Sequence, residues 1–415
     1  MVSKSKNIII CRLCKKNNLK TIIDFGSIPL GNNLKSNKQS SICLEKYPLS
    51  INQCLDCKHY QLSYSVDPKL LYATNYTYLT GVGKSFRNHL EKFTDDVLDF
   101  FEHKVKKDKI KVIDIGSNDG TALSCFANLG CEVLGIDPAK IPSDIANKKN
   151  INTINDFFSL DLAKKIVKEN KSADIVISHN VLAHIEDIHD IFEGIKQILK
   201  TNGVFVFEVG YFGDIILKNI FDTIYHEHLD YHSIVPMTKF LLSKGFSIKK
   251  IENNTIQGGT LRFYCIKDKF PLIFPSVKKL LDVEEKIFSS NNVDEWIKNI
   301  FKNIENIKQN INEALNKDLV VWGYGAPTKA ALITNLLGDI RNSIRFIVDD
   351  NCLKENKYIP GTQIPIIKKK ERPVLQDQLI ICFAWNFFDD ILAKLKTENI
   401  KGTLLNINNG KREKL

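Results

Sequence analysis

The stretch KIKVIDIGSNDGTALSCFANLG, residues 109–130, determines the fold of the central part of this chain. Its apolar residues up to Ile115 predict a short buried strand, the glycines after them predict a tight turn, and the remainder predicts a helix. Gly116 and Gly120 allow the backbone to pass close to a ligand at the end of that strand. The next predicted strand, CEVLGIDP (131–138), ends in Asp137, which could hold the two hydroxyls of a ribose.

The sequence on both sides of this stretch alternates between the same two kinds of element. A helical pattern over 85–105 precedes it, and ADIVISHNVLAHI (173–185) predicts a strand that runs into a polar loop. A helix that ends at a glycine is predicted at 187–203. Further strands are predicted at 204–211, 245–251 and 260–266. Strands that alternate with helices predict an α/β fold with a mainly parallel sheet covered by helices on both faces.

A second α/β unit follows a charged helical region at about 275–316. DLVVWGYGAPTKAALITNLL (318–337) predicts a strand, a glycine turn and a helix, and later strands are predicted at IRFIVDDN (344–351) and QLIICFAWNF (378–387). Gly323 and Gly325 lie at the turn, and Lys329 lies one helical turn further on. Backbone amides, a helix N-terminus and a lysine suit a phosphate, although a simple packing turn is the alternative. We expect a small Rossmann-like domain here.

Length and composition limit the class of protein. The 415 residues are too many for one core, and we expect domains at 1–70, 71–275 and 276–415. The net charge of +10 is spread along the chain, so it fits a phosphorylated substrate as well as it fits nucleic acid, which we do not expect as a partner. Apolar runs are too short for a signal peptide or a membrane span. We therefore expect a cytoplasmic protein without membrane contact, as a monomer or weak homo-oligomer.

The N-terminal region contains two Cys-x-x-Cys pairs with turn-rich sequence between them. Zinc prefers four soft ligands in a tetrahedron, and each pair supplies two thiolates from one tight turn. The sequence therefore predicts a structural Zn²⁺ site with no open position for catalysis, and its ligands are Cys11, Cys14, Cys54 and Cys57. Unligated thiols or a redox pair are the alternatives, and His59 is a less favoured ligand. The other six of the ten cysteines are expected to be mostly buried and free of disulfides.

The central turn has the pattern of S-adenosylmethionine (SAM) methyltransferases rather than of dinucleotide-binding proteins, because the full Gly-x-Gly-x-x-Gly fingerprint is absent. In the segment NDFF (155–158), Asn155 and Phe157 lie where such enzymes cover the adenine. Asn180 and His184, after the strand at 173–179, could face cofactor or substrate. Each assignment has an alternative without a ligand. The glycine turn could be a simple turn, the phenylalanines of NDFF could belong to the core, and Asn180 and His184 could only structure their loop. The predicted cofactor residues are Asp114, Gly116, Asn118, Asp119, Gly120, Asp137, Asn155, Phe157 and Asn180.

The stretch YHEHLDYH, residues 225–232, gathers three of the nine histidines with two acids and two tyrosines. A HExxH zinc-protease helix would need histidine where the chain has Asp230, so that interpretation fails. His228 and His232 could share a metal, but no further clustered ligand is visible. A general acid/base loop fits better, and a polar surface loop remains the alternative.

Four blocks, in order along almost the whole chain, resemble the three-domain sugar C-methyltransferases of deoxysugar pathways. They are the paired Cys-x-x-Cys, DIGSNDGT (114–121), FDTIYHEH (221–228), and GYGAPTKA (323–330) followed by VDDN, PGTQIPI and WNF. The YHEH and GYGAP blocks are the specific ones. The resemblance implies a class I methyltransferase core between a zinc-bearing N-terminal domain and a Rossmann-like C-terminal domain.

The resemblance also implies a reaction. The substrate would be a nucleotide-linked 4-keto sugar, which loses its proton at C3 and takes a methyl group from SAM on the enolate carbon. His228 would be the base, with Tyr225, Glu227 and Tyr76 as the other catalytic residues. The resemblance implies Tyr78 and, from the QGGTLRFY strand (257–264), Gln257, Gly258, Gly259 and Arg262 as substrate-binding residues. His184 of the loop after 173–179, and Gly325 and Lys329 of the second glycine turn, complete the predicted substrate-binding set.

Three rival functions remain open at this level. One is a nicotinamide-dependent sugar-nucleotide oxidoreductase that uses the C-terminal Gly-x-Gly, and NAD binding would distinguish it. Another is a SAM-dependent methyltransferase of a different small metabolite. The third is a zinc-containing binding module, which would show no affinity for SAM.

Overall fold

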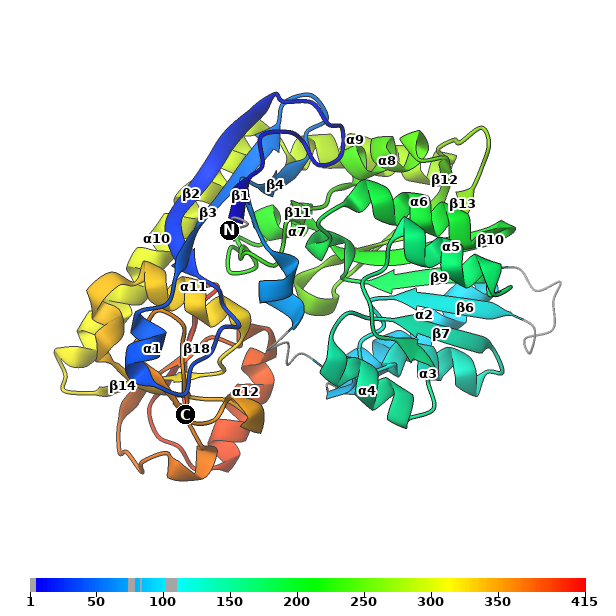
Figure 1. Cartoon of the computed structure of the whole chain (residues 1–415). Coiled ribbons are helices and arrows are strands. Elements are labelled where there is room, and N and C mark those ends of the chain that lie inside the picture. Colours follow the sequence, from blue (N-terminus) through cyan, green and yellow to red (C-terminus); the bar gives the residue numbers. More distant parts are fainter. Residues whose placement is uncertain (1–4, 74–78, 83, 102–109) are drawn as a thin grey trace. The chain divides into compact units, whose positions relative to one another are not determined.

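The computed structural model describes residues 5–73, 79–82, 84–101 and 110–415. Its backbone divides into two compact units, each built from several parts of the chain. Unit 1 comprises residues 1–20, 52–213 and 229–287, and unit 2 comprises residues 21–51, 214–228 and 288–415. Figure 1 shows the labelled elements of both units, which are described separately below.

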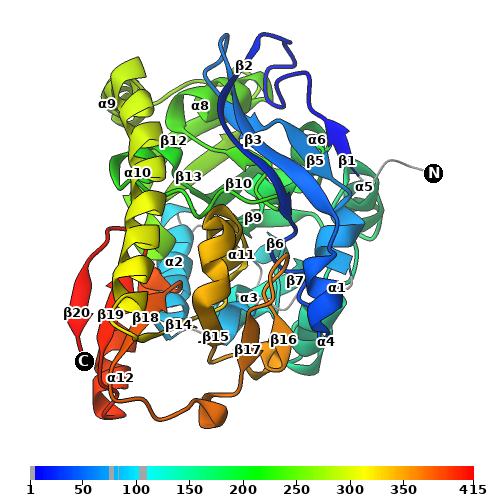
Figure 2. The same ribbon diagram turned by 90° about the vertical axis from the view of Figure 1, so that its left-hand side faces the viewer.

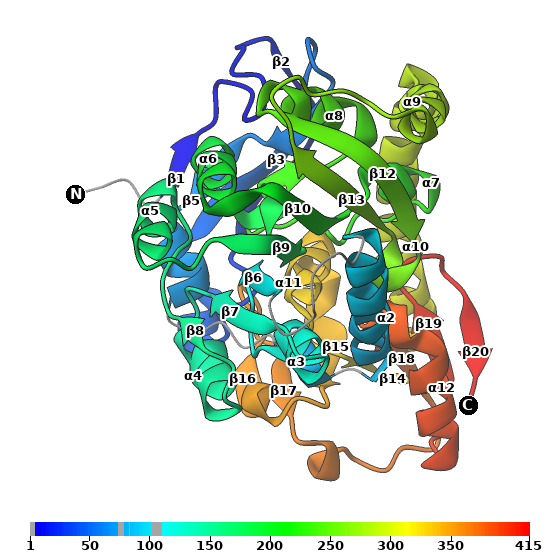
Figure 3. The same ribbon diagram turned by 90° about the vertical axis from the view of Figure 1, so that its right-hand side faces the viewer.

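Unit 1 is built on a seven-stranded sheet in the order β12-β13-β10-β9-β6-β7-β8, seen in Figure 3. All neighbouring pairs from β10 to β8 are parallel, whereas β13 is antiparallel to both of its neighbours. The strands are β6 (Lys111–Ile115), β7 (Glu132–Ile136), β8 (Thr153–Ile154), β9 (Ala173–His179), β10 (Leu199–Gly210), β12 (Phe246–Asn254) and β13 (Thr260–Lys267). The strand order reverses between β6 and β9, and open α/β sheets bind their ligands at such a point, at the carboxyl ends of the strands.

Helices cover both faces of this sheet because alternate strand residues point to opposite sides. Ile113 of β6 belongs to one buried cluster and Val112 to the other. On the side of Val112 lie α2 (Lys84–Phe100), α3 (Thr121–Asn128) and α4 (Lys140–Lys148). On the side of Ile113 lie α5 (Leu160–Lys168), α6 (Ile188–Ile198), α8 (Ile234–Ser243) and α9 (Pro275–Ile287).

The N-terminal region forms small antiparallel sheets. β1 (Ser5–Asn7) pairs with β5 (Tyr64–Val66), and a four-stranded sheet has the order β11-β4-β3-β2. Its strands are β2 (Leu19–Pro29), β3 (Lys46–Cys54), β4 (Tyr60–Leu62) and β11 (Asp230–Tyr231), and the helix between β2 and β3 is α1 (Lys38–Ile42). The long β2 and β3 run side by side in Figure 2.

Unit 2 contains the second α/β sheet, in the order β16-β17-β15-β14-β18-β19-β20. Its inner strands are parallel, and β16 and β20 are antiparallel edge strands. The strands are β14 (Val320–Tyr324), β15 (Ile344–Val348), β16 (Lys357–Tyr358), β17 (Pro365–Ile367), β18 (Gln378–Cys382), β19 (Thr403–Asn406) and β20 (Arg412–Lys414). The principal helices are α10 (Ser290–Leu315), α11 (Thr328–Leu336) and α12 (Phe388–Thr397), and the short α7 spans Phe212–Leu217.

The predicted fold class is confirmed: there are two α/β units with parallel central strands, each with a glycine turn after its first strand. The predicted boundaries at residues 70 and 275 do not coincide with the two compact units, because short segments near residues 21–51 and 214–228 join the C-terminal part. The three-domain division stays a prediction. Within the described ranges, no helix is both long and apolar enough to cross a bilayer.

Candidate active site and zinc centre

The turn after β6 brings its glycines to the end of β7. The Gly116 amide donates to the Ile136 carbonyl at 2.8 Å, and the Asn118 amide donates to Asp137 Oδ2 at 2.9 Å. Gly116 has φ +77°, and a Cβ placed there would lie 2.2 Å from Val181 Cγ2. Only glycine therefore fits this position without displacing the segment after β9.

Two buried polar atoms at this turn are left for a ligand. Among the described residues, Asp114 Oδ1 and Ser117 Oγ are buried without a hydrogen-bond partner. Burial raises the pKa of Asp114, and the neighbouring Asp137 carboxylate raises it further. Burial also raises the pKa of Asp137, while the amides of Ala139 and Asn118 oppose that rise. Unpartnered buried acceptors are costly unless a donor fills them, and the ribose hydroxyls and ammonium group of SAM are such donors.

The other predicted cofactor residues lie around the same edge of the sheet. Asn118 Oδ1 accepts from the Thr80 amide at 2.9 Å, and Asp119 Oδ2 accepts from the Gly81 amide at 3.2 Å. Asn155 Nδ2 donates to the Asp137 carbonyl at 3.0 Å, which holds the segment after β8 beside the end of β7.

The two phenylalanines of NDFF differ: Phe157 is 42% exposed, whereas Phe158 is 7% exposed and belongs to the core. Asn180 follows β9 with φ +54°, and His184 ends a short 3₁₀ turn, Leu182–His184, where it is half-buried. Asn180 thus lies at the reversal of strand order, next to the β6 turn. The structure gathers the predicted cofactor residues at the carboxyl ends of β6, β7, β8 and β9.

The four paired cysteines form one cluster in which all Sγ atoms lie within 4.8 Å of one another. Cys11 Sγ lies 3.5 Å from Cys57 Sγ, and Cys14 Sγ lies 3.6 Å from Cys54 Sγ. A tetrahedron with Zn–S bonds of about 2.3 Å has edges of about 3.8 Å, so the cluster fits Zn²⁺. His59 is not part of it, because its Nε2 lies 2.8 Å from Asp230 Oδ1. None of the ten cysteines forms a disulfide, as predicted.

The YHEH segment pairs its first and last residues. Tyr225 Oη lies 2.9 Å from His228 Nε2, and His228 Nδ1 lies 2.8 Å from the Thr223 carbonyl oxygen. A carbonyl only accepts, so Nδ1 carries the proton and, in the neutral ring, Nε2 accepts the hydrogen of the Tyr225 hydroxyl. Both side chains are half-buried. This arrangement can move a proton from Tyr225 to His228.

The two middle residues of YHEH are buried. Asn32 Nδ2 donates to both carboxylate oxygens of Glu227, at 3.0 and 3.1 Å, and burial raises the pKa of Glu227 to about 7. His226 Nε2 lies 3.1 Å from the Tyr47 carbonyl, and burial lowers the pKa of this imidazole to about 4. Asn32 in turn accepts from Thr328 Oγ1 at 2.8 Å. No motif in the sequence around Asn32 predicts its contacts with Glu227 and Thr328.

The second glycine turn uses its donors within the protein. The Gly325 amide donates to the Val348 carbonyl at 2.7 Å, and the Ala326 amide donates to Asp349 Oδ2 at 2.6 Å. Lys329 Nζ forms an ion pair with Asp222 Oδ2 at 2.8 Å and lies 4.2 Å from the centre of the Trp385 ring. Burial lowers the pKa of Lys329, and Asp222 opposes that effect. These contacts occupy the groups on which the phosphate prediction for Gly325 and Lys329 rests.

The remaining predicted substrate residues have different positions. Gly258 and Gly259 have φ of +98° and +131°, at the turn that leads into β13. Arg262 is buried, with ion pairs to Glu208 at 2.7 Å and Asp96 at 2.8 Å, so its guanidinium holds the sheet together instead of facing a ligand. Its predicted substrate contact is corrected accordingly. Tyr76 and Tyr78 lie outside the described residues, and so does the side chain of Gln257.

Three family models match successive parts of the chain. They are described as "Putative zinc binding domain" for residues 11–72, "Methyltransferase domain" for residues 86–248 and "C-methyltransferase C-terminal domain" for residues 255–406. The C-methyltransferase NovU of Streptomyces niveus is 27% identical over 389 residues, which cover 93% of this chain and 92% of that protein.

Two further similarities cover smaller shares of the chain. A ubiquinone biosynthesis O-methyltransferase of Bartonella tribocorum is 28% identical over 101 residues, 23% of this chain and 40% of that protein. The solved structure of the PH0226 protein from Pyrococcus horikoshii OT3 matches with a TM-score of 0.37 and 17% identity, over 46% of this chain and 95% of that one.

The class I sheet, its SAM-type turn and the matching methyltransferase domain define a SAM-dependent methyltransferase. The full-length relative and the C-terminal model make it, more particularly, a C-methyltransferase with an N-terminal zinc-binding region. The resemblance drawn from the sequence blocks is thereby confirmed for the enzyme class and for both cofactors, SAM and zinc.

Proposed function

We propose that this C-methyltransferase acts on a nucleotide-linked 4-keto deoxysugar and transfers the methyl group to C3. The observation that carries the proposal is the Tyr225–His228 pair, whose tautomer is fixed by the Thr223 carbonyl. A carbon becomes a good nucleophile only after it loses a proton, and a neighbouring ketone makes that proton acidic. A half-buried tyrosine on an imidazole is a suitable proton acceptor for this step.

The first step forms an enolate. The Tyr225 oxygen takes the C3 proton while its own proton moves to His228 Nε2, so the imidazole ends positively charged and the C3–H electron pair becomes the enolate. This differs from the sequence-based expectation, in which His228 itself is the base. Glu227, whose pKa lies near 7, can supply a hydrogen bond to the developing oxyanion in its neutral form.

The second step forms the new bond between carbon and methyl. SAM, when bound, supplies an electrophilic methyl group, so no metal is required at the reacting carbon. Asp114 and Ser117 of the β6 turn are proposed to hold SAM through the atoms that lack protein partners, and Asp137 is proposed to accept from the ribose hydroxyls in addition to its two backbone amides. Tyr225 keeps the proton that it took from C3, the S-adenosylhomocysteine left by the transfer departs with the methylated sugar, and His228 releases its surplus proton to solvent before the next turnover.

The nucleotide-sugar class is supported by the resemblance of the YHEH and GYGAP blocks and by the net charge of +10. We retain Tyr76, Tyr78, His184, Gln257 and Gly258 as proposed substrate residues on that resemblance alone. Lys329 is withdrawn from this group, because Asp222 already compensates its charge.

The proposal is tested with labelled SAM and a panel of nucleotide-linked 4-keto sugars, followed by proton exchange in heavy water. Wild-type enzyme should methylate at least one keto sugar and exchange the proton next to its ketone. His228→Ala should lose exchange and methylation by about 10²–10⁴-fold while binding SAM normally. Tyr225→Phe should behave in the same way, because the relay needs both groups.

Two results would contradict the proposal. Exchange at the wild-type rate in His228→Ala would remove the histidine from proton transfer. Turnover of a substrate without an acidic C–H, together with inactivity on every keto sugar, would show that the substrate class is wrong.

A further inference from the structure

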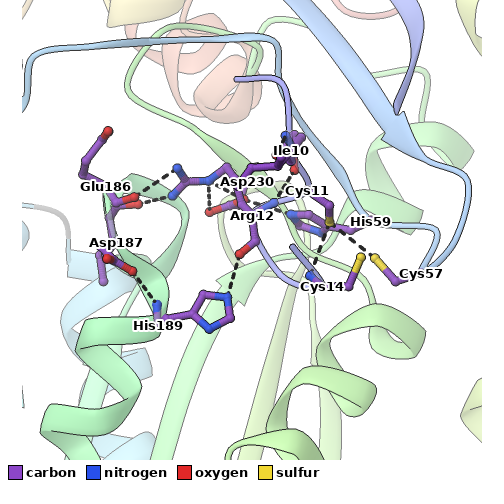
Figure 4. A network of polar contacts seen from close by, with 12 residues as sticks. Ile10, Cys11, Arg12, Cys14, Cys57, His59, Glu186, Asp187, His189 and Asp230 are labelled. Atoms are coloured by element: carbon purple, nitrogen blue, oxygen red, sulfur yellow. Dashed lines mark hydrogen bonds and ion pairs between the residues drawn. The ribbon is translucent and has the colours of Figure 1, made fainter. Parts of the chain in front are cut away.

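We propose that Arg12, which lies between the zinc ligands Cys11 and Cys14, is a positioning residue for catalysis. It fixes the segment that directly follows YHEH and the loop that follows β9, so the zinc site sets the geometry of the reaction without taking part in it. The catalytic half of this inference rests on the proposed function of Tyr225 and His228. Figure 4 shows Arg12 and the residues around it, and the residues that it labels all belong to unit 1.

The Arg12 side chain is buried and binds three partners. Its Nε lies 2.9 and 3.0 Å from the two carboxylate oxygens of Asp230, which is two residues beyond His228. Its other nitrogens donate to the carbonyl oxygens of Glu186, at 3.1 Å, and of Ile185. One guanidinium therefore joins a carboxylate just after YHEH to the backbone of the loop after β9.

The second zinc knuckle reaches the same carboxylate. His59, two residues after Cys57, places its Nε2 2.8 Å from Asp230 Oδ1. Asp230 is 2% exposed, and its partners Arg12 and His59 lie within two residues of zinc ligands. A buried carboxylate needs such partners to remain ionised, so its place depends on theirs.

Backbone contacts strengthen the connection. The Arg12 amide donates to Gln61 Oε1 at 2.8 Å, and Gln61 pairs with Asp230 where β4 meets β11. The Leu62 amide donates to the Leu229 carbonyl at 2.9 Å, and the Leu229 amide donates to the Ala183 carbonyl at 2.7 Å. Leu229 adjoins His228, and Ala183 adjoins His184.

Helix α6, which follows the loop after β9, also contacts the knuckle. His189 Nε2 donates to the Arg12 carbonyl oxygen at 2.9 Å, as seen in Figure 4. This loop begins at Asn180, one of the predicted cofactor residues. The zinc knuckles thus hold chain segments that adjoin both the cofactor residues and the proton-transfer residues.

Zinc explains why these contacts can be rigid. The two knuckles lie in a region with few helices, and four thiolates around one ion close a shell that has no position for substrate. The Cys11–Cys14 turn carries Arg12, so the ion fixes the backbone from which the guanidinium projects. We infer that the enzyme retains zinc for this positioning.

The test compares Arg12→Met with a matched variant in the same loop, Lys16→Met. Lys16 forms an ion pair with Asp56 at 3.1 Å at the surface, where its side chain is 64% exposed. Zinc per chain, hydrogen–deuterium exchange of the peptides that contain Ala183 and Leu229, SAM affinity, kcat and KM are measured for both full-length variants.

Arg12→Met should keep about one zinc per chain, lose exchange protection around Leu229, and lose kcat on the order of 10²-fold with little change in KM. Lys16→Met should match wild type in every readout. Wild-type kcat and wild-type protection in Arg12→Met would overturn the inference.

If Arg12→Met fails to fold or to hold zinc, Asp230→Asn tests the inference instead, because the Asp230 substitution leaves the knuckles intact. It should reproduce the loss of kcat and of protection, and an Asp230→Asn enzyme with wild-type values would overturn the inference. The exchange readout needs no substrate. If His228→Ala proves active, the proposed function fails, while loss of protection in Arg12→Met would still support the structural half of the inference.

Discussion

The two glycine turns of this enzyme have nearly the same backbone and opposite side-chain chemistry. In each, the amide of the glycine after the first strand donates to the last carbonyl of the next strand, at 2.8 Å for Gly116 and 2.7 Å for Gly325. In each, the acid after that next strand accepts an amide from the turn, at 2.9 Å for Asp137 and 2.6 Å for Asp349. The hydrogen bonds of the backbone do not distinguish the turns.

The side chains, by contrast, distinguish the two turns. Two residues before the glycine, the first turn has Asp114 and the second has Gly323, where a Cβ would lie 2.7 Å from the Phe383 ring. The first turn keeps buried acceptors without a protein partner, whereas Lys329 of the second is paired with Asp222. The comparison teaches that a glycine turn marks a ligand site only where polar atoms remain for the ligand. We interpret the first as the SAM site and the second as a support for residues 222–228.

The largest expected effect comes from breaking the Lys329–Asp222 pair. Lys329→Met leaves Asp222, which is 2% exposed, as an uncompensated buried charge, so stability should fall by about 3–5 kcal/mol in denaturant unfolding. The double variant Lys329→Met, Asp222→Asn should recover part of this loss. We expect kcat to fall while SAM affinity stays unchanged.

A phosphate-binding lysine would behave differently. If Lys329→Met raised the KM for the nucleotide sugar without changing stability or kcat, the second turn would be a ligand site after all. The distinction between the two turns would then be lost.

The pH dependence of stability tests the burial of Glu227, the carboxyl group that the second turn supports through Asn32. The pKa of Glu227 is about 7 in the folded state, above its ordinary value of 4.5, because the side chain is buried. The folded state therefore binds this proton more strongly, and stability should decline as pH rises from 4.5 to 7, by at most about 3 kcal/mol.

Glu227→Gln should remove this part of the pH dependence, since glutamine resembles the neutral acid. Glu132→Gln, at a side chain that is 59% exposed, is the control and should retain it. Identical stability profiles for wild type and Glu227→Gln would mean that Glu227 is ionised throughout this range.

Much of the fold could be predicted from the sequence because it depends on local patterns. The apolar run before Gly116 and the one before Gly325 specify strands, and two Cys-x-x-Cys pairs, each in one tight turn, specify the metal. The predicted cofactor residues likewise follow from their places at strand ends. The zinc cluster formed as expected because each pair needs only its own tight turn and one partner pair.

The contacts of the candidate site could not be predicted in the same way. Asn32 and Glu227 are 195 residues apart, and Lys329 and Asp222 are also far apart in the chain, so no local pattern relates them. The resemblance implied a substrate contact for Arg262, but three-dimensional packing places its guanidinium between acids. Motifs identify which residues matter, whereas only the fold shows which charges are already paired.

A calorimetric titration of SAM into Asp137→Asn and Asp349→Asn tests the central claim most directly. The two acids have matched roles: each accepts one amide of its glycine turn and one amide two residues ahead, at 2.8 Å in both cases. The substitutions therefore disturb matched backbone contacts, and Asp349→Asn also weakens the ion pair of Asp349 with Lys354 at 3.4 Å. Asp137→Asn should weaken SAM binding by about 1.5–3 kcal/mol, the cost of losing a charged acceptor, and Asp349→Asn should bind SAM like wild type. Equal affinities in the two variants, or a loss only in Asp349→Asn, would contradict the assignment of SAM to the first turn.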